Sequence, residues 1–200
     1  MAGWSEHRGK AVSLPFEGVD TDQLIPARFM SAPRSEGYGK FLLHDLRRTD
    51  GEPDPDFPLN RVEADGASVL VAARNFGGGS SREAAVYALY DAGFRVVIAP
   101  SFGDIFSGNA VNNGLLPALV TEADSDALLA ALDHPQPLDV DLENCRITLG
   151  DLVVPFTIDP VQRTKLINGW DDIDLTRSHS DAIAAFRDRV ADARPWIMID

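Results

Sequence analysis

The feature that most constrains the fold is a strand, a glycine-rich loop, a helix and a second strand that follow one another between residues 67 and 99. Residues 67–73 form an apolar run suited to a buried strand, and residues 84–92 contain helix formers with one apolar face. Gly93 is placed to end that helix, and residues 94–99 form a second apolar run. This order predicts two parallel strands joined by a right-handed crossover, and therefore an α/β fold.

The rest of the chain carries patterns typical of further strands and helices around this unit. We predict additional strands at residues 10–16, 115–120, 138–142, 145–149 and 152–157. We predict additional helices at residues 104–112, 125–132 and 178–193, and a short helix at residues 38–47. Gly150-Asp151 indicates a hairpin between the last two strands. In the last helix, Ile183, Phe186 and Val190 share one apolar face.

A long segment at residues 31–60 lacks this regularity. It is rich in proline, glycine and charge, as in the run G-E-P-D-P-D at residues 51–56. Segments of this length in compact enzymes are commonly lids or binding loops. We therefore predict one domain over residues 1–200 with a flexible flap at about 31–60. The alternative is that the segment packs a short surface helix onto the sheet.

Charge and apolar run lengths exclude two classes of partner. The formal net charge is −13 with an isoelectric point near 4.6, and no cluster of lysine and arginine is present. Nucleic-acid binding needs a basic face, so we expect no nucleic-acid partner. No apolar run reaches the roughly 20 residues that span a bilayer, so we expect no membrane partner. Residues 1–15 lack the apolar core of a signal peptide, and a cytoplasmic location is expected.

Cysteine and histidine content argues against a metal held by this chain. Cys145 is the single cysteine, whereas zinc and iron–sulfur sites use several cysteine or histidine ligands. The four histidines lie far apart in the sequence without ligand spacing. We therefore predict that this chain binds no metal and no cofactor of its own.

The glycine-rich loop is the strongest local signal of a functional site. Gly77, Gly78 and Gly79 leave backbone N–H groups unobstructed at a helix N-terminus, where an anion is favoured. No phosphate-binding fingerprint fits the sequence, so the anion is predicted to be a carboxylate, with Arg82 as its two-pronged partner. Ser80 has two interpretations. It can cap the helix in a box with Glu83, or it can be a serine activated by glycine amides and arginine.

Two acidic stretches are ambiguous in the same way. Asp20-Thr21-Asp22 resembles an acidic pair used in acid–base chemistry, or an Asx turn that starts a helix. Residues 168–172, with the sequence N-G-W-D-D, are interpreted as a turn, with a functional site as the alternative.

Several motifs in one order resemble the small subunits of 3-isopropylmalate dehydratase, which belong to the aconitase superfamily. The resemblance runs across nearly the whole chain. Its motifs are V-D-T-D-Q-L-I-P-A-R-F at residues 19–29, N-F-G-G-G-S-S-R-E at 75–83, V-V-I-A-P-S-F-G-D-I-F at 96–106, N-N-G-L-L-P at 112–117, F-T-I-D-P at 156–160 and N-G-W-D-D-I at 168–173. No single motif is decisive, but their order is highly specific.

The resemblance implies a fold and a reaction. The implied fold is a three-layer β/β/α swivelling domain of the aconitase superfamily. The implied reaction is a stereospecific dehydration and rehydration of 2-isopropylmalate, a small dicarboxylate, in leucine biosynthesis. A [4Fe–4S] cluster on a separate large subunit would activate the substrate hydroxyl.

The same resemblance assigns roles to residues of this chain. Ser80 matches the base that removes a proton from the adjacent carbon. Arg82 matches the residue that holds a substrate carboxylate, with Gly79 and Ser81 beside it as further substrate-binding residues. Asp22 matches the aspartate that supports the acid–base network.

Three departures from the usual family pattern bear on the substrate. Gly78 replaces a cysteine, Ala84 replaces a histidine, and Thr164 lies where the usual sequence is R-R-H-C. A paralogous hydro-lyase acting on another substituted malate, and a non-catalytic partner subunit, are therefore alternatives. An apolar substrate branch would need an apolar patch in or beside the flap. The candidates are Phe29, Met30, Tyr38, Phe41, Leu42 and Leu43.

Overall fold

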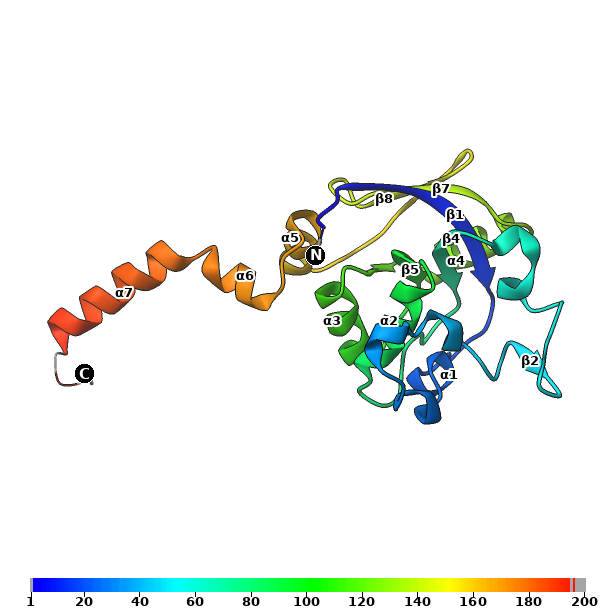
Figure 1. Ribbon diagram of the computed structural model, residues 1–200. Coiled ribbons are helices and arrows are strands. Elements are labelled where there is room, and N and C mark those ends of the chain that lie inside the picture. Colours follow the sequence, from blue (N-terminus) through cyan, green and yellow to red (C-terminus); the bar gives the residue numbers. More distant parts are fainter. Residues whose placement is uncertain (1, 195, 197–200) are drawn as a thin grey trace.

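One curved, mixed sheet organises the protein, which is described by a computed structural model over residues 2–194 and 196 (Figure 1). The strand order is β6-β5-β4-β1-β7-β8-β9. The parallel half consists of β6 (Leu116–Leu119), β5 (Val96–Ala99), β4 (Ala67–Ala72) and β1 (Glu6–Leu14). The antiparallel half consists of β7 (Gln136–Asp141), β8 (Arg146–Leu149) and β9 (Leu152–Pro155). The parallel β4–β5 pair and the β8–β9 hairpin confirm the two strand pairings predicted from the sequence.

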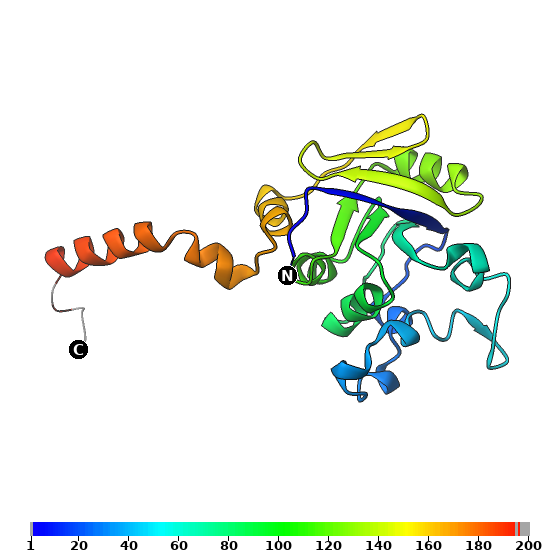
Figure 2. The same ribbon diagram turned by 45° about the horizontal axis from the view of Figure 1, so that its top comes forward.

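The two ends of the sheet meet, which produces a layered fold. Thr157, just beyond β9, forms an antiparallel bridge with Leu119 at the end of β6. The antiparallel strands therefore lie over the parallel ones and enclose an apolar core between them (Figure 2). The helices α1 (Thr21–Leu24), α2 (Glu83–Asp91) and α3 (Asp104–Asn112) lie on the other side of the parallel strands. The result is the predicted three-layer β/β/α arrangement.

The central parallel strands are buried on both faces. Val69 and Val71 of β4 point into the core between the β-layers, whereas Leu70 and Ala72 point into the core beneath the helices. Because both faces are covered, such strands need continuous apolar sequence rather than alternation. This explains the apolar run from which β4 was predicted.

The remaining elements complete the layers and extend beyond them. Helix α4 (Glu122–Ala131) packs on β4 and β5, and Leu128 reaches the core between the β-layers. Helix α5 (Pro160–Asn168), capped by the Asp159 side chain, contacts α3. Helices α6 (Asp172–Arg177) and α7 (Ser180–Ala193) project away from the body as an arm (Figure 1). Within the described residues, no helix is long and apolar enough to cross a membrane.

Several sequence predictions were inaccurate in detail. The predicted helix at residues 38–47 is wrong: a 3-10 turn (Gly39–Phe41) is present instead, and Leu43 has a φ of +52° that ends any helical path. Strand β1 begins at Glu6 rather than at residue 10. The sequence did not indicate α5 or α6, because neither carries a strong apolar stripe.

Residues 31–60 form turns rather than a regular element. They include a two-stranded hairpin, β2 (Arg48–Thr49) with β3 (Glu52–Pro53). The short 3-10 turns in and around the segment are Ala27–Phe29, Arg34–Glu36, Gly39–Phe41, Pro58–Asn60 and Val62–Ala64.

The segment also supplies part of the core beneath the helices, through Tyr38, Leu42, Leu43 and Phe57. Tyr38, Leu42 and Leu43 therefore cannot form an accessible apolar patch. Phe29, Met30 and Phe41 keep exposed surface.

Candidate functional site

Three loops meet at the carboxyl ends of β1, β4 and β5, which is where open parallel sheets bind ligands. Backbone hydrogen bonds tie the loops together. Gly77 N–H donates to the Val19 carbonyl at 2.7 Å, and Thr21 N–H donates to the Gly78 carbonyl at 2.9 Å. Phe76 N–H donates to the Ser101 carbonyl at 3.0 Å. We call the loop at residues 75–82, held between its two neighbours, the glycine-rich edge.

Glycine is required at two positions of this edge because other groups approach closely. Gly77 has a φ of +70°, and a Cβ there would lie 2.3 Å from the ring of Phe106. A Cβ at Gly103, on the neighbouring loop, would lie 2.5 Å from the Gly77 carbonyl oxygen. The two loops can therefore pack against each other only with glycine at both places.

The acidic stretch after β1 caps a helix and contacts the glycine-rich edge. The Asp20 carboxylate accepts a hydrogen bond from Gln23 N–H at 2.8 Å, and the Gln23 side chain accepts one from Asp20 N–H at 2.9 Å. This capping box confirms the interpretation that the stretch begins a helix. Asp22 in the first turn of that helix is exposed and forms an ion pair with Arg82. The structure therefore joins Asp22 and Arg82, 60 positions apart in the sequence.

Arg82 lies in a half-enclosed position suited to holding an anion. Its side chain is 18% exposed, against 52% for Asp22. Its Nη1 atom is buried and makes no well-aligned hydrogen bond with a described residue, although the Asp22 carboxylate lies beside it. A guanidinium that is largely shielded from water, with part of its donor capacity unused, can bind a further carboxylate.

Ser80 does not cap the helix that follows it. Helix α2 begins at Glu83, its N-cap is Arg82, and no side chain caps it. The capping box of Ser80 with Glu83 is therefore wrong. The Ser80 hydroxyl makes no hydrogen bond to the described part of the chain, whereas the Ser80 carbonyl accepts one from Thr21 Oγ1 at 2.8 Å. The backbone of Ser80 is held and its hydroxyl is available for chemistry.

The site is open in the single chain. Gly79, Ser80 and Ser81 are exposed. A cavity of about 300 Å³ lies nearby, at the ends of β5 and β6, lined in part by Phe102, Ser107 and Ile158, but Ser80 is not among its lining residues. A substrate on Ser80 and Arg82 would therefore need a second surface to enclose it.

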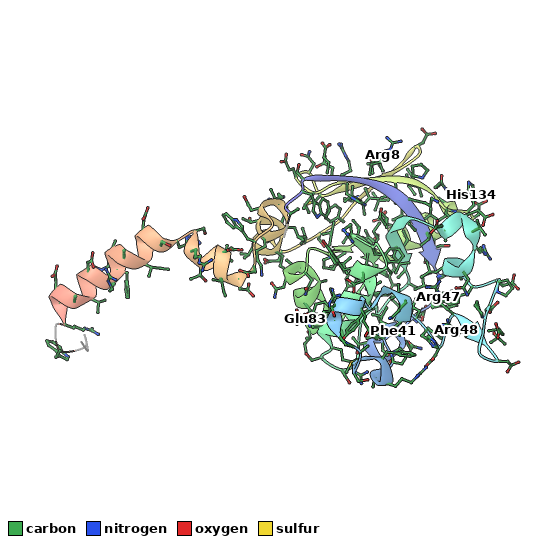
Figure 3. All side chains as sticks on the ribbon, viewed as in Figure 1. Arg8, Phe41, Arg47, Arg48, Glu83 and His134 are labelled. Carbon is green, nitrogen blue, oxygen red and sulfur yellow. The ribbon has the colours of Figure 1, made fainter. Side chains whose placement is uncertain are left out.

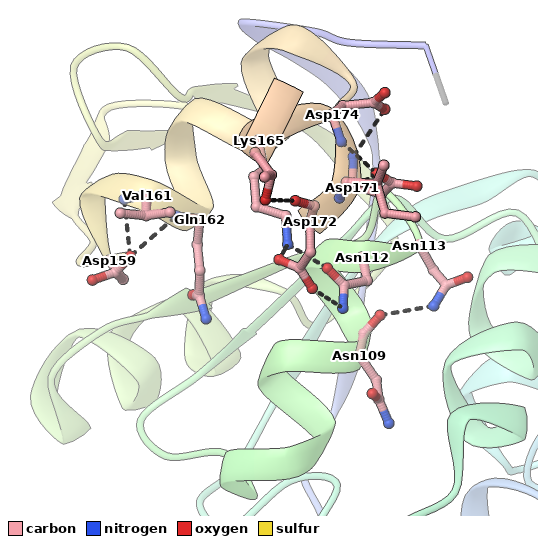
Figure 4. A network of polar contacts seen from close by, with 12 residues as sticks. Asn109, Asn112, Asn113, Asp159, Val161, Gln162, Lys165, Asp171, Asp172 and Asp174 are labelled. Carbon is pink, nitrogen blue, oxygen red and sulfur yellow. Dashed lines mark hydrogen bonds and ion pairs between the residues drawn. The ribbon is translucent and has the colours of Figure 1, made fainter. Parts of the chain in front are cut away.

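A polar network on the α2–α3–α5 side was missed by sequence reasoning about the site. Asn113 Nδ2 donates to the Glu83 carboxylate at 2.8 Å. Its neighbour Asn112 accepts from the buried Lys165 ammonium, which also pairs with Asp172 (Figure 4). The motifs N-N-G and N-G-W-D-D were the signal that could have revealed it.

Helix α2 also contacts the segment at residues 31–60. The Arg34 guanidinium lies over the Tyr87 ring, 4.4 Å from its centre, and pairs with Asp91. Burial, together with the nearby Glu83 carboxylate, raises the pKa of the Tyr87 hydroxyl.

Across the part of the chain that the structure describes, the donor groups do not suit a metal or a cluster. Within the described residues, no group of three or more histidine, cysteine, aspartate and glutamate side chains is placed to hold a metal ion. Cys145 lies in the turn between β7 and β8, where its thiol contacts the Leu142 carbonyl. A [4Fe–4S] cluster needs three or four ligands, so it does not fit this chain.

Comparison with known proteins identifies the family. Residues 1–123 match the Aconitase C-terminal domain family. The chain is 45% identical over 192 residues to a 3-isopropylmalate dehydratase small subunit from Geobacillus kaustophilus, covering 94% of this chain and 98% of the relative. It is 44% identical over 185 residues to the small subunit from Shouchella clausii, covering 92% and 94%. The chain belongs to the family of 3-isopropylmalate dehydratase small subunits.

A solved structure supports the fold of this small-subunit family member. The crystal structure of a 3-isopropylmalate dehydratase protein from Methanocaldococcus jannaschii superimposes with a TM-score of 0.67 over 90% of this chain and 98% of that one. The two sequences are 24% identical, so this likeness speaks for the fold alone. The family resemblance predicted from the sequence motifs is confirmed.

The departures from the usual small-subunit pattern have small local effects. A Cβ at Gly78 would lie 3.2 Å from the Asn75 side-chain oxygen, a contact that a flexible side chain can relieve. Ala84 is partly buried in the first turn of α2 and packs against the core. Thr164 is exposed on α5, where its hydroxyl donates to the Pro160 carbonyl at 2.9 Å. None of the three disrupts the loops that carry Ser80 and Arg82.

Proposed function

We propose that Ser80, Arg82 and Asp22 form this chain's half of a 3-isopropylmalate dehydratase active site. As a small subunit of that enzyme, the chain is part of a hydro-lyase that works with a large subunit. The reaction converts 2-isopropylmalate into 3-isopropylmalate by dehydration and rehydration, in leucine biosynthesis. The observation that carries the proposal is the retained S-S-R-E sequence at residues 80–83 of a family member, with Ser80 exposed and Arg82 paired with Asp22.

Arg82 binds a carboxylate of the substrate in this proposal. Its guanidinium can offer two parallel N–H donors, which match a carboxylate and fix its orientation. Asp22 holds the guanidinium in place before substrate arrives, from a position exposed enough to move aside. Gly79 and Ser81 flank Ser80 and are proposed to line the same binding surface.

Ser80 acts as the base in this proposal. Its alkoxide takes the proton from the carbon next to the one that carries the hydroxyl, the electron pair of that C–H bond forms the double bond, and the hydroxyl group leaves as hydroxide, which becomes water by taking a proton from a general acid that we place on the large subunit. In the rehydration, water returns that proton to the acid while its hydroxide adds to the carbon that lost the C–H proton. Ser80 gives its proton to the carbon that lost the hydroxyl and becomes the alkoxide again. A serine alkoxide needs stabilisation, which the neighbouring glycine N–H groups and Arg82 are placed to supply.

The cluster and the partner are also part of the proposal. Because no donor set in the described residues fits a [4Fe–4S] cluster, we place the cluster on the large subunit, where it would activate the substrate hydroxyl. The open surface around Ser80 is consistent with a site that the large subunit closes. A cytoplasmic location remains a prediction of the sequence.

The segment at residues 31–60, together with the two residues before it, is proposed to select the substrate branch. Phe29 and Phe41 are half-buried and stack with ring centres 4.4 Å apart, and Met30 beside them is exposed. This surface suits an isopropyl group. A paralogous enzyme for another substituted malate would differ there, so comparing 2-isopropylmalate with malates of smaller branches distinguishes the two activities.

Reconstitution tests the proposal. The purified chain alone should show no visible iron–sulfur absorbance and no dehydratase activity. Addition of the large subunit with its cluster should give turnover of 2-isopropylmalate. Turnover by the isolated chain would contradict a divided site. Association without turnover of any branched malate would favour the non-catalytic partner.

A further inference from the structure

The arm formed by α6 and α7 carries apolar side chains that its own chain does not cover. Ile173 is 61% exposed, Ile183 51% and Phe186 58%. Helix α7 is 14 residues and therefore about 21 Å long. One face of α7 carries Ile183, Phe186 and Val190, because steps of three and four residues return to the same side of an α-helix. Figures 1 and 2 both show this arm projecting from the body.

The two helices of the arm form a groove rather than a flat surface. The groove encloses about 530 Å³ and is lined by Ile173, Thr176, Ile183 and two arginines, Arg177 and Arg187. Soluble proteins rarely leave apolar residues gathered in this way without a partner. Asp172 also lines the groove, and Arg177 and Arg187 pair with Asp174 and Asp188 of the arm, so the apolar floor rather than the charge is what suits a partner.

The base of the arm is fixed to the body by a buried charge. The Lys165 side chain is 6% exposed and its ammonium binds both Asn112 and Asp172, the first residue of α6 (Figure 4). A buried lysine is stable only when paired, so this contact holds the start of α6 against α3 and α5. The orientation in which the arm leaves the body is thereby set.

The same network leads to the proposed active site. Asn113, next to Asn112, donates to the Glu83 carboxylate, and Glu83 follows Arg82 directly. Figure 3 shows Glu83 on the side of the body from which the arm leaves, and Arg48 on the far side. The arm is therefore rooted beside the surface that the large subunit has to close.

Area distinguishes the possible occupants of the arm. An aromatic side chain buries about 150–250 Å² when fully covered, and isoleucine is smaller, so three half-exposed side chains offer at most on the order of 300 Å². Two arms of separate copies would bury roughly twice that, well short of the 1,000 Å² or so that a stable interface needs. The arm alone cannot hold a second copy, but it can extend a larger interface.

We propose that the apolar face of α6 and α7 docks into an apolar cleft on the large subunit. The arm thus extends the interface that closes the active site. This inference rests on the proposed function, since it takes the large subunit as the partner.

The test is the affinity of the full chain for the cluster-loaded large subunit, with turnover measured in the same samples. Phe186→Asp should weaken association about 30-fold or more, as expected for an aromatic anchor. The matched control is Ala185→Asp, which adds the same charge one residue away, about 100° around the helix. The control should stay within about 2-fold of the unmodified chain.

Two further measurements separate the outcomes. Thermal unfolding of Phe186→Asp should be unchanged, because Phe186 contributes nothing to the core. At saturating large subunit its kcat should equal that of the unmodified chain. Equal affinities of Phe186→Asp and the unmodified chain overturn the inference while leaving the proposed function intact. Association that depends on Phe186 but yields no dehydratase activity overturns the proposed function and supports the docking arm.

Discussion

Two loops of this protein contain glycine and lack regular structure, yet they are held in different ways. The glycine-rich edge at residues 75–82 is bound through its backbone to loops on both sides, as in the bonds of Gly77 N–H to Val19 and of Phe76 N–H to Ser101. Within the described residues, the backbone at 31–60 bonds almost entirely to itself, with Leu43 N–H to the Leu24 carbonyl as a contact outside it.

Side chains rather than backbone hold the longer segment. Arg34 and the Tyr38 N–H bind Asp91 of α2, while Leu42 and Leu43 are buried in the core. The hairpin of β2 and β3 beyond them is exposed and contacts little else. The difference shows why the base is predicted on one loop and substrate selection on the other. A backbone fixed on both sides can aim a hydroxyl, whereas an exposed hairpin between two ends that are anchored by buried side chains, such as Leu43 and Phe57, can adapt to a substrate.

The largest expected effect comes from Ser80→Ala. Removing the proposed base should lower kcat by about 10²–10⁴-fold with less change in KM. Thermal unfolding should be unaffected, because Ser80 does not cap α2. An unchanged kcat in the presence of the large subunit would show that Ser80 is not the base, even if other residues of the glycine-rich edge bind substrate.

Gly77→Ala should break the edge itself. The new Cβ would clash with the Phe106 ring at a φ that disfavours L-residues, so we expect a loss of about 3 kcal/mol of stability. The matched control is Gly108→Ala on α3, where a Cβ meets nothing within 4 Å and helix propensity favours alanine. Urea unfolding measures both. Equal stabilities of the two variants would contradict the close packing of the loops.

Arg82→Lys should affect substrate binding more than turnover. Lysine keeps the charge but loses the two-pronged geometry, so KM should rise by about 10-fold. Asp22→Asn, which removes the partner that holds the guanidinium, should raise KM less. Steady-state kinetics with 2-isopropylmalate give both values. If Asp22→Asn raised KM more than Arg82→Lys did, Asp22 would act on the substrate directly and not only through Arg82.

The smallest expected effect is a local change in amide hydrogen exchange in the segment at residues 31–60. Hydrogen exchange on the free chain should be fast at residues 44–56 and slow at Phe76 and Gly77, whose amides are bonded between loops. Protection of residues 44–56 should appear only with the large subunit and substrate. Strong protection across residues 31–50 in the free chain would defeat the flap hypothesis.

Most of the fold could be predicted because its signals are local. The apolar run of β4, the glycine after α2 and the turn at Gly150 each act within a few residues, so pattern rules identify them. The helix predicted at residues 38–47 failed because Leu42 and Leu43 owe their burial to contacts with distant parts of the chain rather than to a helical stripe.

The candidate site shows the same difference between local sequence signals and contacts made by distant parts of the chain. The sequence by itself determined which residues we propose for the chemistry, since S-S-R-E after a glycine run and D-T-D after a strand are recognisable as motifs. Only the tertiary structure decided that Arg82 pairs with Asp22, that Ser80 leaves α2 uncapped and that Lys165 is buried against Asp172. Parallel strands bring their carboxyl ends together regardless of separation along the chain, and local sequence patterns do not encode which side chains then meet.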